Sequence, residues 1–68
     1  MRLKVPEVVE LAKNFTSQQA GFNFPKLLEV KSDESKSQWT VILDVGLFIP
    51  LRKEVVIDDK DGNVIGFK

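Results

Sequence analysis

The chain carries one run of acidic and amide residues that has the look of a metal-binding loop: Asp58-Asp59-Lys60-Asp61-Gly62-Asn63. Counted back from Gly62, the calcium-loop pattern D-x-[DN]-x-[DN]-G places Asp61 and Asp59 at its fifth and third positions. The first position is then Ile57, which offers no oxygen ligand, and Lys68 stands where a glutamate would complete the loop. The run therefore predicts a tight turn, with Gly62 supplying a positive φ, rather than a metal site.

The remaining side chains give little catalytic chemistry. The sequence has no His and no Cys, which excludes an imidazole base, a thiolate nucleophile and the common zinc sites. Ser35 and Lys36 are adjacent, but their polar surroundings do not lower a lysine pKa, and no G-x-S-x-G motif occurs. Asp44 is the one acid inside an apolar run, and we interpret it as an outward-facing sheet residue. We therefore predict that the chain is not an enzyme and has no catalytic residue, metal or cofactor.

Charge and length restrict the partners and the location. Ten Lys and Arg balance ten Asp and Glu, so no net field draws the chain to nucleic acid, and no basic residues interleave with Trp39 to form a stacking platform. No apolar run approaches the roughly 20 residues of a membrane helix. No apolar signal region follows the first residues, so we expect a cytoplasmic protein without a membrane partner. Its 68 residues correspond to a single domain, 1–68.

The elements that hold these residues follow from periodicity. From Pro6 to Ala20, apolar residues recur at about 3.6-residue spacing, Pro6 suits a first helical turn, and Gly21 is a natural stop. Alternating residues then predict strands at 26–31, 38–48, 52–58 and 64–68, separated by a polar loop at 32–37 and the turn at 59–63. The expected fold is α+β: an N-terminal helix packed on an antiparallel three- to four-stranded β-meander. The predicted core is Val8, Leu11, Ala12, Phe15, Leu28, Val30, Trp39, Val41, Leu43, Val45, Val55, Ile57 and Ile65.

The second half of the chain resembles the gas-vesicle accessory protein O family. The resemblance lies in four motifs: Trp39-Thr40-Val41-x-x-Asp44-Val45, Ile49-Pro50, Glu54-Val55-x-x-Asp58 and Asp61-Gly62-x-x-x-Gly66-Phe67. The helix-then-meander layout is also similar to cystatin-like and PepSY-like domains, in which strands wrap around one helix. The resemblance chiefly supports an expectation about the fold, because related folds carry unrelated functions.

The stretch from Val41 to Leu51 contains one charge in eleven residues. One helix covers only one face of a sheet, so we expect the other face to bind a second copy of the chain or another protein. The predicted interface residues are Ile42, Asp44, Phe48, Ile49 and Leu51. In the alternative packing, Phe48 and Ile49 fold back over the end of the helix. A second functional hypothesis is a ligand- or peptide-binding domain that modulates a protease, as the PepSY-like resemblance implies. Its groove would be lined by Phe15, Phe22, Phe24 and Trp39.

Overall fold

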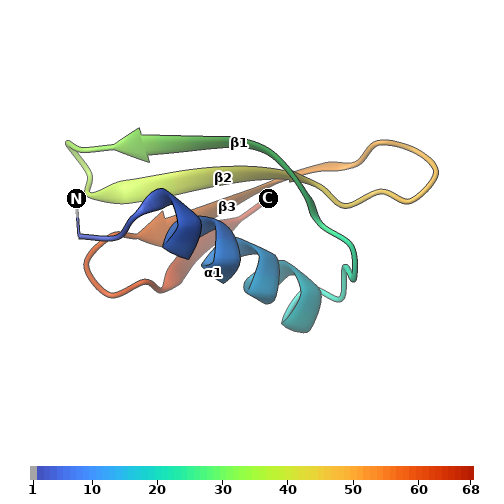
Figure 1. The fold of residues 1–68 in the computed structure, drawn as a ribbon, viewed down its shortest axis with the longest axis horizontal. Coiled ribbons are helices and arrows are strands. Elements are labelled where there is room, and N and C mark those ends of the chain that lie inside the picture. Colours follow the sequence, from blue (N-terminus) through green and yellow to red (C-terminus); the bar gives the residue numbers. More distant parts are fainter. Residues whose placement is uncertain (1) are drawn as a thin grey trace.

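The computed structural model describes residues 2–68 and has the expected α+β fold (Figure 1). One helix precedes four strands in the order α1 (Val5–Gln18), β1 (Lys26–Asp33), β2 (Gln38–Asp44), β3 (Arg52–Asp58) and β4 (Val64–Phe67). The strands form one antiparallel meander, β1-β2-β3-β4, in which every strand pairs with its neighbours in sequence. The helix lies across one face of the sheet. Among the described residues, no helix combines the length and apolar character needed to cross a bilayer.

The ends of α1 use local signals that the sequence contains. At the first turn, the Glu7 carboxylate accepts a hydrogen bond from the Lys4 amide at 3.2 Å, and Pro6 stands where no N–H is needed. At the other end, Gly21 adopts a φ of +79°, and the Phe22 amide donates to the Thr16 carbonyl at 3.0 Å. The predicted helix reached Ala20, and the observed helix ends two residues earlier, at Gln18.

The core lies between α1 and the inner face of the sheet. Cross-strand register places Val41 opposite Val55 and Trp39 opposite Ile57, so these four side chains form a layer on which the helix packs. The buried cluster is Val8, Ala12, Trp39, Val41, Leu43, Val45, Val55 and Ile57. All eight belong to the predicted core, and the predicted Leu11, Phe15 and Val30 pack against the cluster while remaining partly exposed.

The core prediction is wrong for Leu28 and Ile65, because each of these residues is 50% exposed. A β-bulge causes each error. The register of β1 against β2 passes over Leu28, and the register of β3 against β4 passes over Ile65. An extra residue in a strand shifts the alternation of side chains between the faces, so a strict period of two no longer assigns them.

The outer face of the sheet is less bare than the sequence indicated. Ile42 was expected to need a partner on this face, but its side chain is fully buried. Its register neighbours are Glu29 on β1 and Glu54 on β3. Their carboxylates lie 3.8 Å from the ammonium groups of Lys31 and Lys68, respectively. Long charged side chains cover apolar surface with their aliphatic stems, and this accounts for the burial of Ile42 without a partner protein.

Candidate interaction surface

The predicted strand 38–48 ends early, at Asp44, and residues 45–51 form a loop that we call the apolar loop. In Figure 1 this loop projects beyond the sheet, at the end of the elongated molecule opposite the N-terminus. The Val45 amide donates to the Leu51 carbonyl at 2.9 Å and closes the base of the loop. A Cβ at Gly46 would overlap the carbonyl of Ile49, so the turn of the backbone requires glycine there.

The Asp44 carboxylate is the second element that shapes the apolar loop. Its Oδ1 accepts hydrogen bonds from the Leu51 amide at 3.1 Å and the Gly46 amide at 3.0 Å. These bonds, the one from Leu51 first, lower the pKa of Asp44 below its ordinary value. Asp44 also lies opposite Arg52 of β3, a basic residue with which it could form an ion pair. Its observed task is instead to satisfy backbone donors on both sides of the loop.

Replacement of Asp44 by alanine is expected to loosen the apolar loop without unfolding the sheet. Each lost hydrogen bond corresponds to roughly a five- to tenfold change in local opening, so the Gly46 and Leu51 amides should exchange with solvent about tenfold faster. Hydrogen exchange measured by NMR tests this. The control is Asp33→Ala, because Asp33 holds the Ser35 hydroxyl and the Lys36 amide in the distant β1–β2 turn. Equal exchange at Gly46 and Leu51 in wild type and Asp44→Ala would contradict this account of the loop.

Large apolar side chains concentrate on this loop and the nearby connector that follows α1. Phe48 is 98% exposed, and it is flanked by Leu47 at 73% and Ile49 at 78%. Phe24 in the connector is 73% exposed, and Leu51 is 43% exposed. We call these five side chains the apolar patch: Phe24, Leu47, Phe48, Ile49 and Leu51. Scattered exposed apolar residues are normal in soluble domains, but a cluster of this kind marks contact surfaces.

A small cavity opens between the connector and the apolar loop. Its volume is about 140 Å³, and its walls are Gly21, Phe22, Asn23, Phe24, Val45 and Leu47. Val45 is buried and belongs to the core, so the floor of the cavity is part of the core. Phe24 and Leu47 contribute both to this wall and to the apolar patch, which makes the cavity and the patch one continuous surface.

The sequence located part of this surface. Of the five predicted interface residues, three lie in the apolar patch: Phe48, Ile49 and Leu51. Asp44 is not part of the patch but hydrogen-bonds the loop that carries it, and Ile42 is buried in the sheet. Phe48 and Ile49 do not fold back over the end of the helix, because both side chains are almost fully exposed. Phe24 and Leu47 were missed. An aromatic residue directly before Pro25 was the available signal for Phe24, because that position is held in extended backbone away from the helix.

The groove expected for a peptide-binding domain is not formed by its four predicted residues. Trp39 is 8% exposed, and its Nε1 donates to Asp59 at 2.7 Å. Phe15 packs edge-on against Phe67, with the ring centroids 5.5 Å apart. Phe22 and Phe24 lie by the apolar loop instead. The aromatic residues thus serve the core on one side and the apolar patch on the other.

The residues of the calcium-like run serve turn geometry. Asp58 accepts a hydrogen bond from the Lys60 amide at 2.8 Å, and Asp61 accepts one from the Asn63 amide at 3.0 Å. Asp59 is 3% exposed and accepts from the amides of Arg2 and Leu3 as well as from Trp39. The sequence reasoning missed this last role. A buried Trp needs an acceptor for its N–H, and that requirement was the only available signal.

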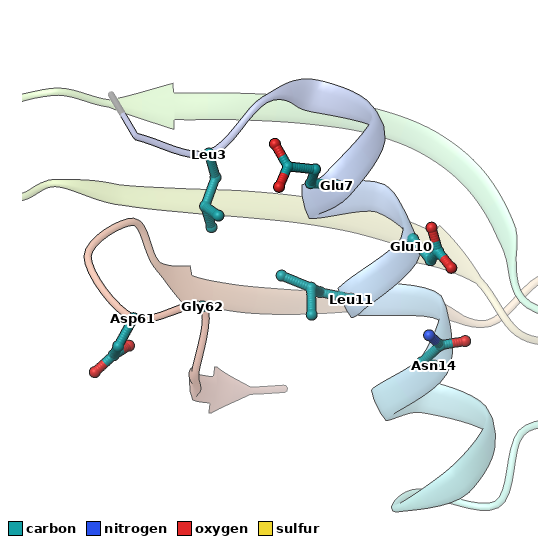
Figure 2. A pocket seen from close by; sticks show the side chains of 7 residues that line it. All are labelled: Leu3, Glu7, Glu10, Leu11, Asn14, Asp61 and Gly62. Carbon is teal, nitrogen blue, oxygen red and sulfur yellow. The ribbon is translucent and has the colours of Figure 1, made fainter.

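A second, larger cavity of about 410 Å³ lies between α1 and the turn after β3 (Figure 2). Leu3 and Leu11 point into it, Glu7 and Glu10 stand at its rim on the helix, and Asp61 points away. Because the carboxylates diverge, they offer no shared coordination site. In the part of the chain that the structure describes, no three metal-ligating side chains converge.

Comparison of the chain with family models, with curated proteins and with solved structures finds no significant match.

Proposed function

We propose that this chain is a non-enzymatic protein-interaction module that acts through the apolar patch. The observation that carries the proposal is the exposure of Phe48, 98%, at the tip of a loop whose base is hydrogen-bonded. A large apolar side chain held in water on an ordered loop costs solvation free energy that folding does not recover. Binding a partner recovers it, and aromatic residues in such positions dominate the energetics of many interfaces.

We place the contact surface on the apolar loop rather than on the outer face of the sheet. On the outer face of the sheet, Ile42 is already buried, and its register neighbours Glu29 and Glu54 are ion-paired. Residues 45–51 contain no charged side chain, so burying them against a protein leaves no charge buried without a partner. Four of the aspartates hold backbone donors: Asp44, Asp58 and Asp61 do so in turns, and Asp59 holds the Arg2 and Leu3 amides. This division of roles supports binding rather than catalysis.

A photo-crosslinking amino acid placed at position 48 tests the proposal in the cells from which the sequence derives. We expect it to give discrete crosslinked protein products. The same amino acid at position 60 is the matched control, because Lys60 is exposed and lies in the turn after β3, outside the patch. Equal labelling from both positions, or no protein product from position 48, would reject the proposed function.

A further inference from the structure

The apolar patch and a cavity of about 140 Å³ lie side by side on the same surface. We propose that the patch binds a second copy of this chain, with Phe48 of each copy entering the cavity of the other. The cavity is the one between residues 21–24 and the apolar loop. This inference rests on the proposed function and names its partner.

The inserting group is held in place before binding. Phe48 is 98% exposed, and the loop that carries it is fixed by the Asp44 carboxylate and by the Val45–Leu51 hydrogen bond. A glycine with no room for a Cβ, Gly46, removes further freedom from the backbone. Because the loop is already ordered, little conformational entropy is lost when Phe48 becomes buried.

The receiving cavity has the size of a phenyl ring. Its volume is about 140 Å³, and its walls include Phe22, Phe24, Val45 and Leu47. An apolar cavity of roughly 150 Å³ accommodates benzene, so the phenyl group of Phe48 fits in volume. Four of the six wall residues are apolar, and Gly21 and Asn23 complete the wall. Phe48 follows Leu47, a wall residue of the cavity, but at 98% exposure it lies outside the cavity of its own chain.

Twofold symmetry allows both insertions at the same time. In an isologous interface the same surface of each copy must contain the inserting group and its receptor. Leu47 and Phe48 meet this condition, because a twofold axis passing close to them sets each Phe48 opposite the cavity of the partner copy. The two aromatic side chains of the patch, at roughly 150–200 Å² each, and its three aliphatic side chains supply a large part of the approximately 800 Å² per partner of a standard interface.

Sedimentation of the full 68-residue chain tests the proposal. We expect a species of twice the 7.7 kDa chain mass at micromolar to submillimolar concentration, and at least a tenfold weaker dissociation constant for Phe48→Ser. Circular dichroism establishes that the variant is folded. A monomer at every concentration overturns the inference, but crosslinking from position 48 to a different protein would still support the proposed function.

Lys26, Arg52 and Lys53 lie near the base of the loop. A monomer that co-sediments with anionic phospholipid vesicles therefore overturns both proposals in favour of a lipid surface.

Disulfide trapping tests the geometry of insertion. The chain has no cysteine, so Phe48→Cys and Asn23→Cys can be made singly and mixed. Asn23 lines the cavity, and the Asn23→Cys copy keeps its own Phe48 to insert into the other copy. We expect a mixed disulfide between the two variants, formed at least tenfold faster than between Phe48→Cys and Lys60→Cys. Equal rates would show that position 48 does not enter the cavity, and would overturn the inference even if the chain dimerises.

Discussion

Replacement of Asp59 by alanine is expected to lower the melting temperature of the protein by roughly 10–20 °C. The carboxylate accepts three hydrogen bonds, from the Arg2 amide at 2.6 Å, the Trp39 indole at 2.7 Å and the Leu3 amide at 2.9 Å. Alanine leaves all three donors without an acceptor, and the indole is buried. The same change frees residues 2 and 3 from the turn after β3. Among residues 2–68, no other polar side chain joins three separate segments through its hydrogen bonds.

The Asp59 carboxylate should also make the stability of the protein depend on pH. Burial of the Asp59 carboxyl raises its pKa, but the hydrogen bonds from Arg2, Trp39 and Leu3 outweigh that effect and lower the pKa from 3.8 to about 2. Because the pKa is lower in the folded state, the stabilisation is complete above pH 4 and is lost as the pH falls toward 2. The pKa of Asp33 is lowered by the Ser35 hydroxyl, and that of Asp44 by the Leu51 amide, so part of the acid sensitivity should remain in Asp59→Asn.

Thermal melts followed by circular dichroism between pH 2 and pH 7 measure both effects, and Trp39 fluorescence reports directly on the indole. Asp61→Ala is the control, because the exposed Asp61 carboxylate accepts only the Asn63 amide in the same turn. That variant should melt within a few degrees of wild type. If Asp59→Ala also melts within a few degrees, the hydrogen bonds to Arg2, Leu3 and Trp39 do not stabilise the fold as described.

Elements that depend on local pattern were predictable from the sequence. The strand Arg52–Asp58 was predicted with its observed bounds, because its alternation is regular and it is limited by Pro50 on one side and the turn at Gly62 on the other. The helix followed from the periodicity of its apolar residues, and its stop at Gly21 followed from the positive φ that glycine readily adopts. The meander order followed from short connections between successive strands.

Features that depend on distant contacts were not predictable in this way. The bulges at Leu28 and Ile65 are set by register with the neighbouring strand, which no single strand encodes. The alternating apolar pattern continues past Asp44, yet the strand stops there because a side chain and a glycine turn the backbone. The patch was found at Phe48, Ile49 and Leu51 but not at Phe24, since its position depends on how the connector returns to the sheet.

Ile42→Ala is expected to destabilise the protein by about 2–4 kcal/mol, although Ile42 lies on the sheet face that the helix does not cover. The reason is its complete burial: truncation removes apolar contacts and leaves a space at a fully buried position. Ile42→Val removes one methylene group and should cost about 0.5–1.5 kcal/mol. Urea unfolding measures these differences, provided that the slope of free energy against urea concentration is unchanged.

Phe48→Ala is the matched comparison, because Phe48 is a larger side chain that the sequence placed in the same interface. At 98% exposure it makes little contribution to the folded monomer. Its truncation should therefore change the unfolding free energy by less than about 0.5 kcal/mol at concentrations where the chain is monomeric. If Ile42 were instead exposed until a partner bound, both variants would stay near wild type in stability. A large loss of stability in Ile42→Ala with none in Phe48→Ala would show that Ile42 is needed for the fold, whereas Phe48 is available for binding.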